Sequence, residues 1–344
     1  MSQRLSLLLG WLEALQASQE VELEEGWELL PVSGDASFRR YFRVKSANHS
    51  WIAVDAPPEK ESCEAFVNIA LAWREEGVNV PEVIKVDFEL GFMLLSDFGD
   101  RLFLPELTEA SAGTLYSKAV SELHLIQQCD ASQLPLYDEA LLKREMALFS
   151  EWFLQGLLTH ELTNEEQLLI EGLQSQLVTS ALEQPQVTVH RDYHSRNLMI
   201  TDQHTPGVID FQDAVKGPIT YDLVSLLRDC YIRWPDALVY TWVDAFREAL
   251  MSDKRLALDT TSEQFAKSFD LMGMQRHLKV LGIFSRLKLR DGKSGYLKDI
   301  PLTLSYVSKV AQKYPEFSEF NRFIEDLIKP AMRSNEAFAG LSIS

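Results

Sequence analysis

Short apolar segments separated by polar turns make up the first hundred residues. Five of them have the composition of β-strands, and Gly, Pro, Asp and Ser residues lie between them. These segments are residues 27–32, 38–44, 51–55, 83–88 and 92–95. Between the third and the fourth, Phe66, Ile69, Ala70 and Trp73 recur at helical spacing on one face. The pattern predicts a small sheet with one helix inserted after its third strand.

Helical spacing dominates the rest of the chain. The leucine stripe within residues 5–15 predicts a helix before the sheet. After the sheet, apolar stripes over residues 115–126 and 141–153 predict helices joined by polar connections. A chain of 344 residues is long enough to form two cores. We therefore expect an α+β protein in two parts, residues 1–98 with the sheet and residues 99–344, which are mainly helical.

The stretch from His190 to Asn197 carries the clearest chemistry. It places Asp192 five residues before Asn197, and a predicted strand–turn–strand over residues 198–209 then leads to Asp210. Such a hairpin would return Asp210 beside Asn197, close enough to share a metal ion. Phosphoryl transfer from Mg-ATP to a hydroxyl needs a carboxylate near the attacking oxygen and oxygen ligands for magnesium. These residue types fit that chemistry; the alternative is a solvated loop with polar residues by chance.

The motif H-R-D-x-x-x-x-N, followed by I-D-F after a hairpin, resembles the kinase-like phosphotransferases, which include protein kinases, aminoglycoside phosphotransferases and choline kinases. The resemblance implies a two-lobed protein-kinase-like fold. A small antiparallel-sheet N-lobe, residues 1–98, would bind the nucleotide, and a mainly helical C-lobe, residues 99–344, would hold the catalytic loop and the acceptor. It also implies ATP and Mg²⁺ as cofactors, Asp192 as the catalytic base, and Asn197 and Asp210 as metal ligands.

Three further residues are expected to support the catalytic loop. His190 and Arg191 precede the expected base directly, and Asp222 follows in a D-x-x-D…G-P…D-L segment typical of small-molecule kinases of this superfamily. Asp222 would accept hydrogen bonds from the loop backbone or from Arg191. The segment after Asp210 is too short to be the activation segment of a protein kinase, which favours a small-molecule substrate.

The nucleotide site is expected on the first part of the chain. Ser33, Gly34 and Ser37 lie in a turn of small residues suited to approach phosphates. The triplet Asp97-Phe98-Gly99 spells the magnesium motif of protein kinases, but it precedes the catalytic loop and follows a predicted strand. We interpret Ser96, Asp97 and Phe98 instead as the hinge, whose backbone would bind adenine.

One feature of the family is missing. Kinase-like enzymes usually carry a phosphate-binding lysine on the third strand, which here reads Ile-Ala-Val-Asp over residues 52–55. Arg43 on the neighbouring strand is the best replacement for that lysine, and the period of two places Arg40 on the opposite face. The alternative is that Arg43 is simply a surface cation.

Within the superfamily, several segments resemble the anomeric amino-sugar kinases of bacterial cell-wall recycling. They include residues 33–44, 55–59, 211–214, 226–231 and 275–284. Those enzymes phosphorylate the C1 hydroxyl of N-acetylmuramate and N-acetylglucosamine and lack the same lysine. The resemblance implies that a cation meets the lactyl carboxylate of N-acetylmuramate. Candidate acceptor-binding residues are Asp213, Arg228, Arg233, Arg276 and His277.

Two other functions remain open. An aminoglycoside or choline-type kinase would carry an acidic acceptor site for a cation. A pseudokinase would bind nucleotide as a regulatory module, a reading that the absent lysine favours and the presence of Asp192, Asn197 and Asp210 disfavours.

Composition limits the classes of partner that the protein is expected to bind. The net charge of −18 argues against nucleic-acid binding, and no apolar run is long enough to span a membrane. The amino terminus lacks a signal-peptide cleavage pattern. Cys63, Cys129 and Cys230 match no metal or disulfide motif, so we expect buried thiols in a reducing cytoplasm. The expected partner is a small amino sugar, and the oligomeric state stays open.

Overall fold

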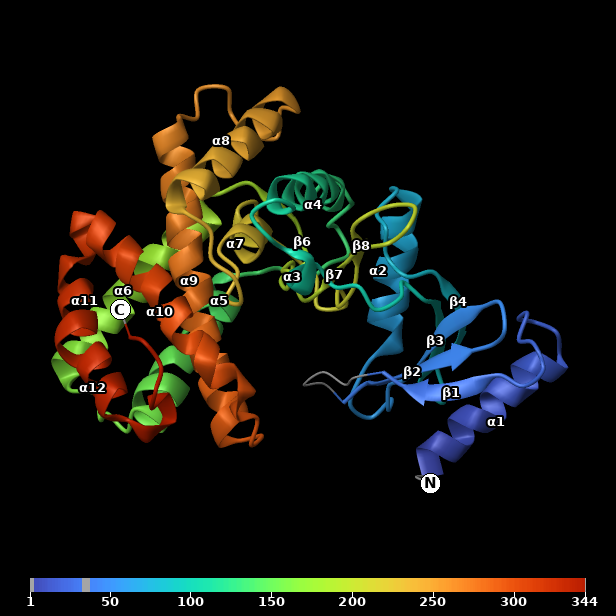
Figure 1. The fold of residues 1–344 in the computed structure, drawn as a ribbon. Coiled ribbons are helices and arrows are strands. Elements are labelled where there is room, and N and C mark those ends of the chain that lie inside the picture. Colours follow the sequence, from blue (N-terminus) through green and yellow to red (C-terminus); the bar gives the residue numbers. More distant parts are fainter. Residues whose placement is uncertain (1–2, 33–37, 344) are drawn as a thin grey trace. The chain divides into compact units, whose positions relative to one another are not determined.

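The computed structural model describes residues 3–32 and 38–343, and its contacts divide the chain into two compact units (Figure 1). The first comprises residues 1–129 and 196–213, and the second comprises residues 130–195 and 214–344. The chain therefore changes unit immediately after Ser195 and again after Asp213. The boundary expected after residue 98 would divide a nucleotide-binding part from a part that holds the catalytic loop and the acceptor. That division of function stays a prediction.

The first unit contains the predicted sheet. Its strands are β1 (Glu28–Pro31), β2 (Arg40–Lys45), β3 (Ser50–Asp55), β4 (Val83–Asp87) and β5 (Phe92–Ser96). They pair antiparallel in the order β1-β2-β3-β5-β4. Each strand lies within one or two residues of its predicted bounds, because short apolar segments bounded by turn residues mark the strands strongly.

A helix covers one face of this sheet. In α1 (Gln3–Ala17), Leu8 and Leu12 are fully buried against Val44, Ala53 and Leu94, which share that face of the sheet. The predicted leucine stripe is thus the sheet-facing side of α1. The other elements of the unit are α2 (Cys63–Glu75), α3 (Phe103–Glu106), α4 (Ala112–Ile126) and the short hairpin of β7 (Leu198–Met199) and β8 (Gly207–Val208).

The second unit is mainly helical, as expected. Two strands, β6 (Gln186–Val189) and β9 (Val215–Pro218), pair antiparallel. The helices are α5 (Glu139–Leu148), α6 (Asn164–Leu182), α7 (Tyr221–Leu227), α8 (Asp236–Ser252), α9 (Ser262–Leu289), α10 (Ile300–Lys313), α11 (Ser318–Phe323) and α12 (Lys329–Ser334). The longest of them, α9, packs against α5, α6, α7, α8 and α10 and forms the centre of the unit (Figure 1).

One predicted helix changes its winding. The apolar stripe over residues 141–153 continues from α5 into a π-helical segment, Phe149–Leu157. The change begins where α9 comes closest: a Cβ atom on Gly282 would lie 2.4 Å from the carbonyl carbon and oxygen of Leu148. Only glycine allows this approach of the two backbones.

Two further expectations concern the chain as a whole. Cys63, Cys129 and Cys230 are free thiols and all are buried, as predicted. Within residues 3–32 and 38–343, none of the helices combines the length and the apolar character that crossing a bilayer requires.

Candidate active site

The loop that follows β6 is fixed by a carboxylate on α7. The Oδ2 atom of Asp222 accepts a hydrogen bond from the backbone N–H of His190 at 2.6 Å, and Oδ1 accepts one from Arg191 at 3.0 Å. Arg191 has a φ of 79°, which is unusual for a bulky side chain, and the two hydrogen bonds hold the loop in that conformation. Asp222 was expected to accept hydrogen bonds from the loop backbone or from Arg191, and it accepts them from the backbone N–H groups of His190 and Arg191. Its supporting role in catalysis stays a prediction. Burial raises the pKa of Asp222 to about 7, against the effect of the two N–H donors.

Asp192 lies at the turn of this loop among basic side chains. Its backbone N–H donates to Nδ1 of His190 at 3.2 Å. Burial alone would raise the pKa of Asp192, yet four neighbouring basic residues lower it to about 2. In order of effect they are Lys279, His194, Arg276 and Arg191. Asp192 is therefore a carboxylate at neutral pH.

A buried glutamate organises two of these cations. Glu145 of α5 accepts from Nη2 of Arg191 and lies 3.2 Å from Nζ of Lys279 on α9. It also accepts from the hydroxyl of Tyr137, and Nζ of Lys279 donates to the hydroxyl of Tyr221 at 3.1 Å. Burial works against the charge on Glu145, but Lys279 and Arg191 lower its pKa overall. The ion pairs fix the cations that surround Asp192.

The end of the loop has its own anchor. Asp229, which is 1% exposed, accepts from the backbone N–H of Ser195 at 3.0 Å and also from the Ser195 hydroxyl. Its second oxygen accepts from the backbone N–H of Tyr231 at 3.0 Å. Two aspartates, Asp222 and Asp229, thus hold the two ends of the segment that carries Asp192.

The predicted hairpin forms in the first unit and brings the expected metal ligands together. β7 and β8 pair antiparallel, and the backbone N–H of Ile209 donates to the carbonyl of Asn197 at 3.1 Å. The side-chain amide of Asn197 donates to Oδ2 of Asp210 at 3.2 Å, and Gln212 donates to Oδ1 at 2.8 Å. Asp210 has a φ of 67°, a conformation that aspartate tolerates better than most residues.

These two side chains fit a hard divalent cation. A carboxylate and a carboxamide oxygen are ligands that Mg²⁺ accepts, and it usually completes its shell with water and phosphate oxygens. Among the described residues, no group of three or more His, Cys, Asp or Glu side chains forms a metal site of its own. A metal bound by Asn197 and Asp210 would thus depend on the substrate's phosphates.

Asn79 and Glu122 of the first unit hold the turn of the β7–β8 hairpin in place. Asn79 donates from Nδ2 to the carbonyl of Pro206 at 3.2 Å, and its own carbonyl accepts from Val208 at 2.8 Å. Glu122, which is 2% exposed, accepts from the backbone N–H of Asn79 at 2.6 Å and lies 2.9 Å from the His204 ring. These contacts fix the turn that returns the chain to Asp210.

Phe211 attaches the other side of the hairpin to α2. Its ring is fully buried and lies 4.6 Å from the ring of Phe66 and 5.6 Å from that of Trp73, measured between centroids. The apolar face of α2 predicted from the sequence therefore holds the residue next to Asp210.

Arg43 has two carboxylate partners. Its Nε lies 2.6 Å from Oδ2 of Asp97 and its Nη1 lies 2.8 Å from Oδ1 of Asp100. Asp97 also accepts from the Ser50 hydroxyl and from the backbone N–H of Gly99 at 2.8 Å. A phosphate would have to compete with these carboxylates for the guanidinium. A phosphate-binding role for Arg43 stays a prediction.

The remaining expected nucleotide residues are only partly described. Ser33, Gly34 and Ser37 lie outside the described residues. The backbone N–H of Ser96 donates to the carbonyl of Glu82 at 2.9 Å, so this donor is used within the sheet. The ring of Phe98 lies so close to Gly207 that a Cβ there would be 2.6 Å from it.

The candidate acceptor residues separate into different environments. Asp213 is exposed and belongs to the first unit, whereas Arg228, Arg233 and His277 belong to the second. Arg228 is buried and lies 2.7 Å from Asp270, so its charge is already paired. Arg233 is exposed, with its guanidinium 6.0 Å from the centre of a tyrosine ring.

His277 is enclosed within the second unit. Its Nε2 lies 2.9 Å from the carbonyl of Arg228, and its ring stacks on Tyr306 with centroids 4.8 Å apart. Burial, with Arg276 and Arg228 nearby, lowers the pKa of His277 to about 3. His277 is therefore neutral and would not supply a positive charge to an acceptor.

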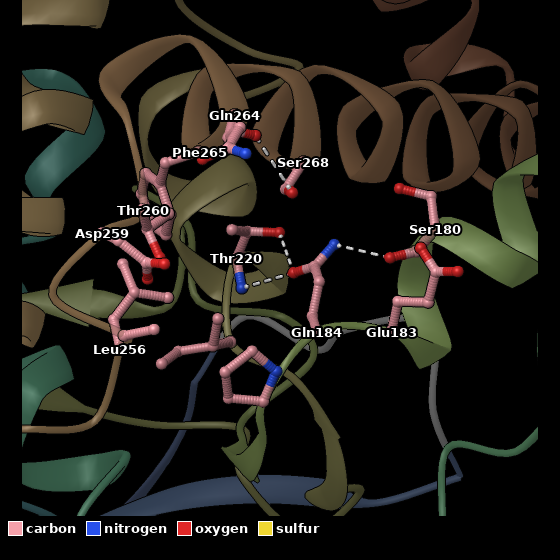
Figure 2. A pocket seen from close by; sticks show the side chains of 13 residues that line it. Ser180, Glu183, Gln184, Thr220, Leu256, Asp259, Thr260, Gln264, Phe265 and Ser268 are labelled. Carbon is pink, nitrogen blue, oxygen red and sulfur yellow. Dashed lines mark hydrogen bonds between the residues drawn. The ribbon is translucent and has the colours of Figure 1, made fainter.

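A cavity of about 480 Å³ in the second unit carries none of the predicted site residues (Figure 2). Gln184 at its wall accepts from the N–H and hydroxyl of Thr220, at 3.3 and 2.7 Å, and donates to the Ser180 carbonyl at 3.3 Å. Its charged lining residues are Glu183 and Asp259, without a lysine or arginine. This cavity does not suit an anionic nucleotide.

Sequence reasoning missed Glu145 and Lys279. In each case the sequence pattern around the residue indicates that it is buried. Glu145 lies three residues after Leu142 and four before Phe149, on the apolar face of its helix, where a carboxylate needs a buried partner. Lys279 lies in a stretch of α9 that is buried on all sides, from Phe269 to Gly282.

Comparison with known proteins decides the family. The sequence profile of the phosphotransferase enzyme family matches residues 28–256. The chain belongs to the phosphotransferase enzyme family. The expectation that it is an enzyme of phosphoryl transfer is thereby confirmed.

Members of this family include close relatives of the chain. It is 41% identical to the N-acetylmuramate/N-acetylglucosamine kinase of Pseudomonas aeruginosa, over 94% of this chain and 97% of the relative. It is 39% identical to the protein of the same name from Neisseria meningitidis, over 95% and 96%.

Solved structures share the fold at much lower identity. An ethanolamine kinase of Plasmodium vivax matches with a TM-score of 0.61 at 11% identity, over 86% of this chain and 83% of that one. The choline kinase LicA of Streptococcus pneumoniae matches with a TM-score of 0.53 at 13% identity, over 88% and 98%. These likenesses confirm the expected protein-kinase-like α+β fold.

Proposed function

We propose that this chain is an ATP-dependent kinase that phosphorylates the anomeric C1 hydroxyl of N-acetylmuramate and N-acetylglucosamine. The observation that carries the proposal is the 39–41% identity to kinases named for these two sugars, which extends over 94–95% of the chain. At the same time the chain retains Asp192, Asn197 and Asp210 in the family's order. The enzyme would act in the cytoplasm on sugars recovered from the cell wall.

Asp192 would be the catalytic base. Its carboxylate would orient the C1 hydroxyl and take the proton as the phosphoryl group leaves ATP. An anomeric hydroxyl is more acidic than an ordinary alcohol, so a carboxylate of low pKa suffices in a loose transition state. The surrounding cations support this role, because they keep Asp192 ionised and fixed.

Asn197 and Asp210 would hold Mg²⁺ on the phosphates of ATP. When bound, the ion neutralises charge on the β- and γ-phosphates. The chain's own contribution is to bring the two ligands together at the open end of the β7–β8 hairpin, where Phe211 and Asn79 fix their positions. Ser33, Gly34, Ser37, Arg43 and the backbone of residues 96–98 remain the proposed nucleotide contacts.

The other functions considered differ in their acceptor. An aminoglycoside or choline-type kinase would need carboxylates to bind a cationic acceptor, whereas four basic side chains act on Asp192. That environment favours a neutral or anionic acceptor.

ADP release in a coupled assay tests the proposal. The acceptor panel would be N-acetylmuramate, N-acetylglucosamine, kanamycin and choline, each with and without excess EDTA. We expect turnover of the two amino sugars only, and its loss when EDTA removes Mg²⁺. Turnover of kanamycin or choline instead, or of no acceptor at all, would contradict the proposal.

A further inference from the structure

Arg276 on α9 is a buried cation that forms no ion pair with a carboxylate of the described residues. The residue is 3% exposed, and its Nε is enclosed without a hydrogen-bond partner. Among the described residues its polar contact runs from Nη1 to Sγ of Cys230, at 3.7 Å. A buried guanidinium normally has an ion pair, because taking the charge out of water is costly. Arg276 lacks that compensation within the described chain.

Other buried cations of the second unit differ in this respect. Arg191 and Lys279 are paired with Glu145, and Arg228 is paired with Asp270 at 2.7 Å. Arg276 is thus a buried cation of this region that forms no ion pair with a carboxylate among the described residues.

Arg276 interacts electrostatically with Asp192, the expected base. Burial works against the charge of Arg276, but acidic neighbours that include Asp192 and Asp229 raise its pKa. Cys230, which it contacts, follows Asp229, and Asp229 fixes the loop end at Ser195. Arg276 therefore lies near Asp192 without being hydrogen-bonded to it.

One of the proposed acceptors carries an anion that could meet this cation. N-acetylmuramate differs from N-acetylglucosamine by a lactyl ether on O3, which ends in a carboxylate. When C1 is at Asp192, that carboxylate lies across the same sugar ring. A fixed arginine binds a carboxylate through two parallel hydrogen bonds, and burial of the side chain reduces the entropy lost on binding.

We infer that Arg276 binds the lactyl carboxylate of N-acetylmuramate and sets the preference for this sugar over N-acetylglucosamine. The inference rests on the function proposed above. It selects one residue from the basic candidates of the sequence, because Arg228 is paired, Arg233 is exposed and His277 is neutral.

Arg276 has one competing role, that of a positioning residue which acts through Asp192. The two roles predict different kinetics. A positioning residue affects every acceptor equally, whereas a carboxylate ligand affects only acceptors that carry the carboxylate.

The test compares Arg276→Met and Arg276→Lys with the wild type on three acceptors. These are N-acetylmuramate, its lactyl carboxamide, which has the same shape without the charge, and N-acetylglucosamine. We expect Arg276→Met to lower kcat/KM for N-acetylmuramate about ten- to hundredfold, mainly through KM, as for loss of a charge-assisted hydrogen bond. The values for the other two acceptors should fall by a smaller factor, equal for both, because Arg276 also helps to lower the pKa of Asp192. Arg276→Lys should recover part of the loss that is specific to N-acetylmuramate.

The ratio between acceptors is insensitive to the folded fraction of a variant, because misfolded protein lowers all three values together. Arg322→Met, at an exposed arginine on α11, is the matched control and should leave the ratio unchanged. An equal loss on all three acceptors would overturn the inference but leave the proposed function standing. If the wild type used neither sugar, the proposed function would fail and the inference with it.

Discussion

At the scale of single residues, the site depends on how burial and charge act on a few side chains. Asp192 is half-buried and His277 is buried, yet the cations around Asp192 keep it charged, while burial keeps His277 neutral. The sequence identified Asp192 from a local motif. It also suggested His277 as a cation for the acceptor, and the environment of the ring argues against that, because burial and two arginines disfavour its protonation.

The first prediction concerns the base. Asp192→Asn keeps the shape of the side chain but removes the proton acceptor, so kcat should fall by about 10²–10⁴, the usual contribution of a general base. ATP binding, measured by calorimetry with Mg²⁺, should stay close to that of the wild type. An Asp192→Asn enzyme that retained full turnover would exclude the assigned role.

The second prediction uses the pKa of His277, which is lowered to about 3. A histidine in the unfolded chain takes up a proton below a pH of about 6.5, and buried His277 does not, so its contribution to stability is present above that pH and is lost as the pH falls. His277→Gln removes this effect. Between pH 7 and pH 5 the variant should lose about 2 kcal/mol less unfolding free energy than the wild type.

Urea unfolding of both proteins at the two pH values measures this difference. Gln retains an N–H donor for the Arg228 carbonyl, so the comparison isolates the titration. Parallel pH dependence of the two proteins would show that His277 is protonated in the fold.

At the scale of elements, patterns that are local in sequence were predicted well and long-range pairings were not. The strands of the sheet, the apolar face of α2 and the β7–β8 hairpin follow from periodicity and turn residues within short windows. The proximity of Asn197 and Asp210 follows from the hairpin alone.

The ion pairs around Asp192 could not be predicted in the same way. Glu145 and Lys279 are 134 residues apart and meet because α5 packs against α9. Helical spacing identifies buried faces but not which faces meet. The pairing of Arg43 with Asp97 was missed for the same reason, because it joins β2 to the segment after β5.

Removal of the buried carboxylate tests how the α5–α9 ion pairs contribute to stability. Glu145→Gln leaves Arg191 and Lys279 without their counter-charge, and breaking a buried ion pair costs about 3–5 kcal/mol of unfolding free energy. Glu139→Gln on the same helix is the control. Its ion pair with Lys143 is exposed and should change stability by less than about 1 kcal/mol. Equal effects in urea unfolding would contradict the role given to Glu145.

The crossing of α9 over Leu148 gives another prediction. Gly282→Ala adds a methyl group 2.4 Å from backbone atoms of Leu148, so the helices must separate, at a cost of about 1–3 kcal/mol or more. Gly172→Ala on α6 has no atom within 4 Å and should stabilise by about 0.5–1 kcal/mol. Thermal unfolding of both variants checks the opposite signs, and a stabilised Gly282→Ala protein would exclude the close crossing.

At the scale of the whole molecule, the chain places its expected base and metal ligands on two units. The second carries Asp192, and the first carries Asn197 and Asp210, five and eighteen residues later. Family membership supports a common function for them. The net charge of −18 belongs to the whole surface, whereas the surroundings of Asp192 are basic. Net charge alone therefore could not have indicated the acceptor.

The most direct test is phosphorus NMR of the product formed from ATP and N-acetylmuramate. We predict a sugar 1-phosphate, recognised by coupling of its phosphorus to the anomeric proton, for the wild type and none for Asp192→Asn. Phosphate on another carbon, phosphate released only to water, or the same product from Asp192→Asn would contradict the account.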